Sequence, residues 1–244
     1  GGLIEIVTFD DNGMATVSTD LPLGSYYLQE RSTDEHYILD DTHYEFEFSY
    51  GSQETQVIEI SVNGGDPIKN DLKYGMVSGR KVDEDGHVIA GAIFGLFRND
   101  ENEYTAENAY LTAESAQDGT FKFEKVPFGA WIVREIQPAK GFVLNETEFP
   151  IDITTDGAVI EIKAENRHIY GAVHTTKVDK DYPDHLLTGA VFEVYRDVSG
   201  NQQFDPDVDE LVGTLSECEP GLYELAELRY GGYFLYEKQA PVNY

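Results

Sequence analysis

The chain has 244 residues, of which 46 are Asp or Glu and only 17 are Lys or Arg, so the formal net charge is −29. Such a surface repels nucleic acids and anionic membranes, and we expect no nucleic-acid partner and no membrane insertion for this segment. Aromatic residues make up 12% of the sequence, which excludes a disordered acidic tail, and the single cysteine, Cys218, excludes an intramolecular disulfide.

Alternation of apolar and polar residues dominates the chain and predicts half-buried β-strands. In chain order, the clearest strands are expected at residues 4–9, 44–50, 57–62 and 159–163. Short turn sequences that end in glycine separate the strands. Residues 105–116 contain alanines and glutamates and predict one short helix. Strands this short and this frequent are typical of an all-β sandwich.

One phrase occurs three times, at residues 21–30, 126–135 and 228–237. Each copy has a turn glycine, an aromatic strand and a glutamate six residues after the glycine; the three glutamates are Glu30, Glu135 and Glu237. The strand phase directs these glutamates inward, where an ionised carboxylate is costly without a partner. We therefore expect each glutamate to meet a polar side chain inside its own repeat.

A second repeated phrase gives the period of the array. Asn70 and Asn166 are 96 positions apart (166 − 70), and so are Lys81 and Lys177 (177 − 81). Two markers with equal spacing predict tandem domains of ordinary size, at residues 1–74, 75–170 and 171–244. The first repeat is expected to lack its opening, lysine-bearing strand, and the third to lack its closing, asparagine-bearing strand. The middle repeat has all three residues.

The middle repeat therefore places Lys81 on its first strand, Glu135 on an interior strand and Asn166 on its last strand, all directed inward. Burial lowers the pKa of a lysine and raises that of a glutamate. A neutral Lys81 amine can attack the Asn166 carboxamide while Glu135 moves protons, and ammonia leaves. The alternative is that Lys81 is a surface lysine and Glu135 a solvated strand residue. That interpretation would be preferred for an isolated motif, but here the motif recurs in register across the repeats.

The terminal repeats carry equivalent residues that cannot complete this reaction within the chain. These residues are Glu30 and Asn70 in the first repeat, and Lys177 and Glu237 in the third.

The combined motifs resemble the B-type repeats of collagen adhesins, also called SpaA-type or prealbumin-like domains, of Gram-positive surface proteins and pili. The resemblance depends on residues 81–83, 91–94, 127–135 and 138–142 with Asn166, and again on 177–179, 189–192 and 236–244. It covers essentially the whole chain. It implies tandem prealbumin-like (Ig-like) β-sandwiches and a Lys–Asn isopeptide bond formed with the help of glutamate.

The resemblance also implies a secreted, cell-wall-associated stalk on a Gram-positive bacterium, with neighbouring repeats of the same protein as partners. No enzymatic turnover is expected beyond the single intramolecular reaction. Two other readings stay open: a binding module for a host matrix protein or a glycan, with Tyr104, Tyr110 and Tyr230 as surface aromatics, or accessory domains of a secreted enzyme.

An oxygen-rich loop at residues 197–210 has some character of a calcium site. Its candidate ligands are Asp197, Ser199, Asn201, Asp205, Asp207 and Asp209. The spacing departs from the helix–loop–helix template, because Val208 stands at the twelfth position. An acidic solvated loop is the simpler interpretation, and no other cofactor is expected.

Overall fold

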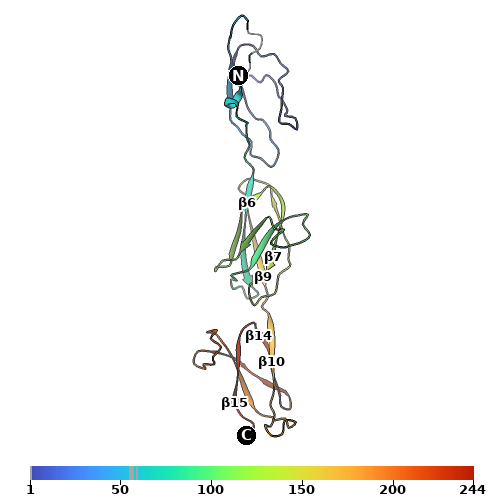
Figure 1. Cartoon of the computed structure of the whole chain (residues 1–244), viewed down its shortest axis with the longest axis vertical. Coiled ribbons are helices and arrows are strands. Elements are labelled where there is room, and N and C mark those ends of the chain that lie inside the picture. The colour runs from blue at the N-terminus through green and yellow to red at the C-terminus, as the bar shows by residue number, and fades with distance from the viewer. Residues whose placement is uncertain (1, 55–57, 59) are drawn as a thin grey trace. The chain divides into compact units, whose positions relative to one another are not determined.

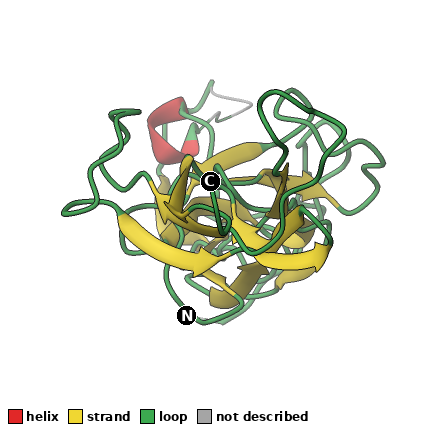
Figure 2. Cartoon of the chain, turned by 90° about the horizontal axis from the view of Figure 1, so that it is seen from below, coloured by secondary structure: helices red, strands yellow, loops and turns green. Residues whose placement is uncertain are grey.

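A computed structural model describes residues 2–54, 58 and 60–244. Within this part of the chain the regular structure is fifteen strands and one 3-10 helix, η1 (Val62–Gly65), and strands make up nearly all of it in Figure 2. The predicted all-β fold is confirmed. The chain divides into two compact units, Gly1–Lys73 and Tyr74–Tyr244, each of which is described separately.

The first unit is lightly packed. Its one sheet pairs β1 (Gly24–Leu28) with β2 (Tyr44–Phe48) in antiparallel register, so that Tyr26 lies opposite Phe46 and their rings stack. Every fully buried hydrophobic side chain of the described residues lies at or after Val77, which is outside this unit. Hydrogen bonds and aromatic contacts, rather than a dense core, therefore hold the described part of the first unit.

The middle repeat, within the second unit, is a sandwich of two sheets (Figure 1). One sheet has the order β6–β3–β9 and the other β5–β4–β7–β8. Their strands are β3 (Tyr74–Asp83), β4 (Ile93–Arg98), β5 (Leu111–Glu114), β6 (Thr120–Pro127), β7 (Gly129–Gln137), β8 (Phe149–Ile153) and β9 (Val159–Asn166). Both sheets contribute to a single hydrophobic core, which contains Val77, Phe94, Phe121 and Trp131.

The strand period explains why polar residues enter this core. In β7 the buried positions are Trp131, Val133 and Glu135, two residues apart, so Glu135 shares the inward phase of two large apolar side chains. Lys81 in β3 and Asn166 in β9 likewise follow buried Val77 and Ala164 in their own strands. The three inward positions thus follow directly from the alternation of each strand.

The third repeat has the same two-sheet plan with fewer strands: one sheet orders β10–β14–β13 and the other β12–β11–β15. Its strands are β10 (Tyr170–Thr176), β11 (Val191–Arg196), β12 (Glu210–Thr214), β13 (Ser216–Glu219), β14 (Leu222–Arg229) and β15 (Tyr233–Gln239). Its smaller core is built around Phe192, Val194 and Tyr223. The division of the second unit at residue 170 stays a prediction.

Two of the expected strands form, at 44–48 and 159–166, and two local predictions are wrong. Residues 4–9 pair with no strand in the described chain, so their alternating pattern stays exposed. Residues 105–116 form one turn and then β5, because Leu111 and Ala113 pack on the core, and tertiary packing overrides helix propensity. The strand expected at 57–62 falls partly on residues 57 and 59, outside the described residues.

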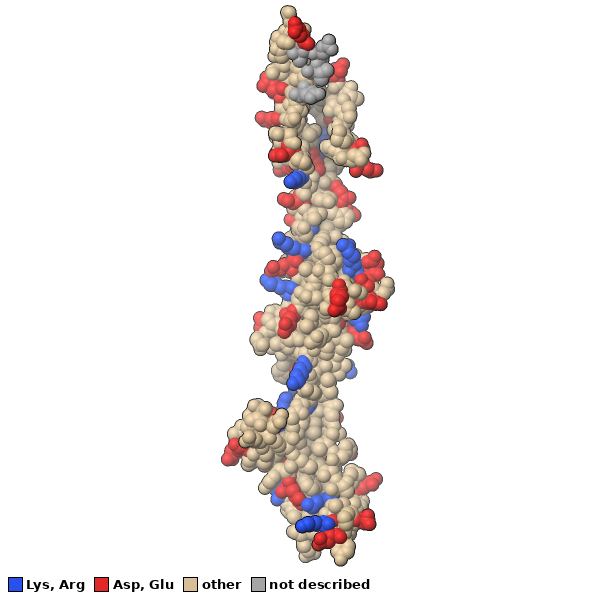
Figure 3. Space-filling model, in the orientation of Figure 1, with Lys and Arg blue, Asp and Glu red and all other residues tan. Residues whose placement is uncertain are grey.

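Acidic side chains are spread over the face drawn in Figure 3 and do not gather in one patch. The charge therefore marks no single docking surface on that face.

Candidate site in the middle repeat

Lys81 is one of the most buried side chains of the protein, with 0% of its surface exposed. Its Nζ lies 5.4 Å from the centroid of the Phe94 ring, which stacks on Phe121 with the two centroids 3.8 Å apart. Burial lowers the pKa of Lys81, because the ammonium loses its hydration, while the charge of Glu135 acts in the opposite direction. The aromatic pair thus encloses an amine that is easier to deprotonate than a surface lysine.

Glu135 contacts both of the other predicted residues. Its Oε1 lies 3.1 Å from Lys81 Nζ, and both of its carboxylate oxygens accept hydrogen bonds of 3.0 Å from Asn166 Nδ2. The Glu135 side chain is 1% exposed, so water does not screen the attraction between the two charges. One carboxylate therefore touches the amine nitrogen and the amide nitrogen at the same time.

Asn166 reaches the site because β9 runs parallel to β3, with Asp83 opposite Asn166 and Lys81 opposite Ala164. Lys81 Nζ also donates a hydrogen bond to Asn166 Oδ1. The structure therefore brings together, in the buried interior, the three residues that the sequence places on the first, an interior and the last strand. A nucleophile, a proton carrier and a carboxamide are in mutual contact.

The first unit contains two of these three residue types, the glutamate and the asparagine. Asn70 Nδ2 donates hydrogen bonds to Glu30 Oε2 at 2.6 Å and to the Ile38 carbonyl oxygen at 2.9 Å. The backbone N–H of Asp40 donates to the same Glu30 oxygen at 2.8 Å. The glutamate and asparagine of this repeat therefore meet as their counterparts in the middle repeat do.

The third repeat contains the lysine and the glutamate. Lys177 Nζ lies 2.7 Å from Glu237 Oε2, but the two side chains are 27% and 31% exposed. Glu237 Oε1 is buried and has no hydrogen-bond partner among the described residues. The lysine and glutamate of this repeat are paired without the enclosure seen around Lys81.

The acidic loop at 197–210 uses its oxygens locally. Asp197 accepts hydrogen bonds from Ser199, Gly200 and Gln202, and Asp205 accepts one from the Asp207 N–H. In the described part of the chain, no three carboxylates of this loop approach one another closely enough to share an ion. Calcium binding by this loop stays a prediction.

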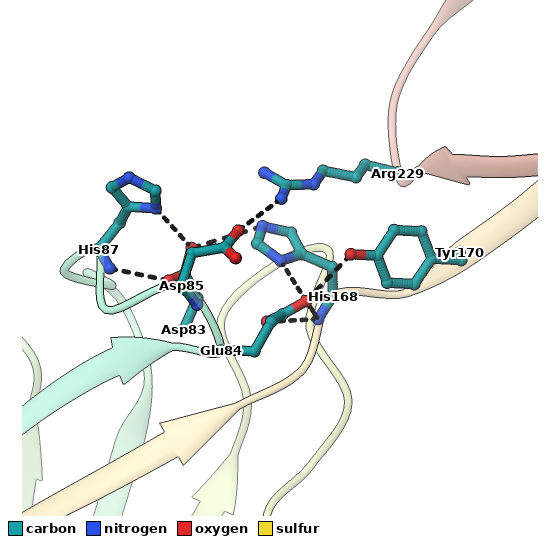
Figure 4. Close-up of polar contacts among 7 residues, drawn as sticks. All are labelled: Asp83, Glu84, Asp85, His87, His168, Tyr170 and Arg229. Carbon is teal, nitrogen blue, oxygen red and sulfur yellow. Dashed lines mark hydrogen bonds and ion pairs between the residues drawn. The ribbon is translucent and has the colours of Figure 1, made fainter.

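The described residues contain one compact group of metal-ligating atoms, from Asp83, Asp85 and His87 at the start of the turn after β3 (Figure 4). Asp83 accepts hydrogen bonds from the backbone N–H groups of Asp85 and His87, and Asp85 pairs with Arg229 at 2.8 Å. These carboxylates are therefore already engaged as a turn cap and as an ion pair.

Glu84 in the same turn joins the two repeats of the second unit. It accepts hydrogen bonds of 3.0 Å from His168 Nδ1 and from the Tyr170 hydroxyl (Figure 4). The pKa of Glu84 is lowered to about 2, first by its own backbone N–H and further by the bonds from His168 and Tyr170. Arg229 of β14 reaches the same turn through its ion pair with Asp85. We interpret this junction as a structural contact.

The surface aromatics expected for a binding module each contact a neighbouring side chain, and Tyr110 and Tyr230 stay about half exposed. Tyr104 lies against Phe97 and the Arg134 guanidinium, and Tyr110 against Trp131. Tyr230 contacts the ammonium of Lys140. None of these contacts identifies a ligand, so a host protein or glycan partner stays a prediction.

The sequence reasoning missed Asn145, whose backbone N–H donates to Glu135 Oε2 at 2.8 Å. Asn145 stands ten residues after Glu135, as Asp40 stands ten residues after Glu30. No sequence signal marks either position, because the contact is made by a backbone N–H and the two residue types differ.

The part of the chain that the structure describes contains no helix with the length and hydropathy of a membrane span.

The chain was compared with curated proteins, with solved structures and with protein-family models. No curated protein matches the sequence. Among solved structures, the Bacillus anthracis TIE protein is 25% identical with a TM-score of 0.67, over 96% of this chain and 39% of that chain. The chain therefore spans well under half of that relative.

Two pilins match with lower TM-scores. A streptococcal ancillary pilin is 24% identical over 98% of this chain and 72% of its own, with a TM-score of 0.38. The pilus 2b backbone protein of group B streptococcus is 17% identical over 62% of this chain and 52% of its own, with a TM-score of 0.35.

The family model for the SpaA domain, described as a prealbumin-like fold domain, matches residues 3–64, 75–168 and 171–244. These three ranges cover most of the sequence and follow one another as tandem copies. The chain therefore belongs to the SpaA family of prealbumin-like domains.

Proposed function

We propose that this chain is a structural stalk segment of a Gram-positive cell-surface protein, and that an isopeptide bond between Lys81 and Asn166 reinforces its middle repeat. The observation that carries the proposal is the buried contact of Lys81, Glu135 and Asn166. Family membership supports the stalk role. Its partners are then neighbouring repeats and other subunits of the same surface assembly, and its location is the cell wall.

The reaction needs no external reagent. Lys81 transfers a proton from Nζ to Glu135 Oε1, which lies 3.1 Å away, and the neutral amine attacks Cγ of Asn166. The Cγ–Nδ2 bond breaks as Glu135 delivers a proton to Nδ2, which lies 3.0 Å from both carboxylate oxygens. Ammonia is then complete, and the second proton lost by Nζ passes to the Glu135 carboxylate, which ends the reaction protonated. One amine and one carboxamide become one secondary amide and one ammonia.

Positioning accounts for the rate of such a reaction. Holding the amine against the carboxamide in a fixed geometry replaces about 7–11 kcal/mol of the barrier that separated groups in water would face. The aromatic cover formed by Phe94 and Phe121 excludes water, which would otherwise solvate the ammonium and oppose its deprotonation. The protein itself supplies both the reactants and the proton carrier, so it acts once and does not turn over.

The bond would serve a mechanical purpose. It closes a loop of about 86 residues, and loop-closure entropy of the kind that applies to disulfides gives roughly 4–5 kcal/mol of stabilisation. It also joins β3 to β9, the first and last strands of the middle repeat. A force that pulls on the two ends of the repeat would load this covalent bond before the hydrogen bonds of the sheet.

Intact mass spectrometry of the folded chain tests the proposal. We expect the wild-type mass to fall short of the sequence mass by one ammonia, and Glu135→Ala and Asn166→Ala to have their full masses. Glu237→Ala is the matched control and should still lose one ammonia, because it changes the equivalent glutamate outside the middle repeat. A full sequence mass for well-folded wild-type protein would reject the crosslink.

A further inference from the structure

The carboxylate of Glu135 is held by a residue outside the three reacting groups. Asn145, in the segment between β7 and β8, donates its backbone N–H to Glu135 Oε2 at 2.8 Å. Its side-chain Nδ2 donates to the carbonyl oxygen of Glu165 at 2.8 Å, and Glu165 directly precedes Asn166. One residue is thus bonded both to the proton carrier and to the strand that carries the carboxamide.

The backbone part of this arrangement occurs twice in the protein. In the first unit, the Asp40 N–H donates to Glu30 Oε2 at 2.8 Å, with the same ten-residue offset and the same distance. The N–H therefore accompanies the glutamate in both repeats where glutamate and asparagine meet, which argues against a chance loop contact.

The geometry at Glu135 shows what the bond does. A carboxylate on a flexible side chain can rotate about its last torsion and exchange its two oxygens. With Oε2 held by the Asn145 N–H, Oε1 is the oxygen that faces Lys81 Nζ at 3.1 Å. The side chain of Asn145 is fixed in turn, because its Oδ1 accepts a hydrogen bond of 2.9 Å from the Thr147 N–H.

We propose that Asn145 is a positioning residue for isopeptide formation: its N–H orients the Glu135 carboxyl group, and its side chain aligns the strand of Asn166 with that carboxyl. This inference rests on the proposed function, since it concerns the rate of the same reaction. Asn145 touches none of the atoms that change bonds. It acts through Glu135 and Glu165.

The test compares variants that remove the N–H with variants that keep it. Asn145→Pro lacks the N–H, while Asn145→Asp retains it and loses only the amide donor to Glu165. Asn145→Ala also retains the N–H but loses both that donor and the acceptor for the Thr147 N–H. Each variant is made by cell-free synthesis, samples are quenched in acid over time, and the fraction that has lost one ammonia is measured by intact mass. Leu144→Pro is the matched control, because its N–H makes no hydrogen bond within the described part of the chain.

We expect Asn145→Pro to react about a hundredfold more slowly than wild type, the scale of a catalytic group displaced by about 1 Å. Asn145→Ala and Asn145→Asp should be slowed by less than about tenfold, and Leu144→Pro should match wild type. A role in folding alone would slow the two proline variants equally.

Three outcomes separate this inference from the proposal beneath it. If wild type loses ammonia and Asn145→Pro does so at the same rate, the positioning role is wrong and the crosslink stands. If wild type itself keeps its full mass, the crosslink is wrong. Should Asn145→Pro fail to fold, the alanine and aspartate variants decide: wild-type rates in both, in folded protein, would overturn the part assigned to the side chain, and slowed rates would support it.

Discussion

The middle and third repeats place the same two residue types in contact but surround them differently. Lys81 and Glu135 are 0% and 1% exposed, whereas Lys177 and Glu237 are 27% and 31% exposed. In the middle repeat β9 lies beside β3, while in the third repeat β10 is paired in the described chain with β14 alone. The third strand of the sheet, rather than the ion pair, is what seals the site and supplies its carboxamide.

The difference changes what the ion pair contributes to stability. The Lys177–Glu237 pair is partly exposed, so water screens it more than the buried pair and it contributes less to stability. A buried pair is strongly coupled to the fold, because removing one partner leaves the other as an uncompensated charge. The two repeats therefore offer a matched experiment inside one chain.

The largest expected contrast is between Glu135→Ala and Glu237→Ala. Glu135→Ala leaves Lys81 buried without its carboxylate and should destabilise the middle repeat by about 3–5 kcal/mol, apart from any loss of the crosslink. Glu237→Ala should cost no more than about 1 kcal/mol. The only tryptophan, Trp131, is in the middle repeat, so its fluorescence during urea unfolding reports on that repeat.

Equal shifts of the Trp131 transition in the two variants would contradict this comparison. Glu237→Ala should leave the midpoint of the Trp131 transition unchanged and move only the unfolding of the third repeat, followed by circular dichroism. If the two glutamates proved equivalent, burial by the closing strand would not be the cause of the difference.

A second contrast concerns the strand beneath the aromatic cover. Gly79 lies opposite Phe121 in the β3–β6 register, and a Cβ at this position would overlap the Phe121 ring. Gly79→Ala should therefore displace Phe121 from Phe94 and destabilise the middle repeat by about 1–3 kcal/mol. The equivalent position of the third repeat is Thr175, opposite Tyr223, where a side chain is already accommodated.

Urea unfolding of Gly79→Ala, with Thr175→Ala as control, measures this effect. Thr175→Ala removes atoms from a half-exposed strand and should change stability by less than about 0.5 kcal/mol. An unchanged Trp131 transition in Gly79→Ala would show that Phe121 can move without cost. The ring stack would then not be needed to enclose Lys81.

Repetition made much of the site predictable from the sequence. The equal spacing of lysines and asparagines, and the strand phase of the glutamate, are enough to place Lys81, Glu135 and Asn166 inward on three strands. Long-range pairing was not predictable in the same way. Residues 4–9 alternate as a strand should but pair with no strand of the described chain, and 111–114 became a strand through contacts with the core.

The contribution of Asn145 was hidden for a different reason. Its contact with Glu135 is made by a backbone N–H, which every residue except proline carries, so the residue type gives no signal. Only the fold of the segment between β7 and β8 shows which N–H points at the carboxylate. The aromatic cover of Lys81 is similar, because phenylalanine in a strand is ordinary and only the packing gives it a role.

The pH dependence of stability gives a third contrast, best measured in Asn166→Ala, where the crosslink cannot form. The pKa of Lys81 is lowered by burial, so between that pKa and the ordinary lysine value of about 10.4 the unfolded chain binds more protons than the folded one. The free energy of unfolding should therefore rise with pH in this window, by up to about 1.4 kcal/mol per pH unit. Below the window, the full cost of burying the charged Lys81 ammonium should be present.

Adding Lys81→Met to Asn166→Ala isolates this slope from other groups that titrate at high pH. The double variant should lose the rise, and the difference between the two urea midpoints should shrink as pH approaches the ordinary lysine pKa. Parallel pH profiles for the single and double variants would mean that Lys81 keeps the same pKa in the folded and unfolded chain. Its enclosure by Phe94 and Phe121 would then have no electrostatic consequence.

The smallest effect is expected at the junction of the two repeats, where Arg229 pairs with Asp85 at 2.8 Å. The two side chains are 40% and 48% exposed, so Arg229→Ala should cost only about 0.2–1 kcal/mol, and the loss should fade in high salt. Lys122→Ala is the control, because its pair with Glu124 lies within β6 alone and is still more exposed. Urea unfolding at low and high salt would measure both. A salt-independent loss in Arg229→Ala would mean that the Arg229 side chain stabilises the junction by packing rather than by charge. The junction would then depend on buried contacts, as the middle repeat does, and not on a partly exposed ion pair, as in the third repeat.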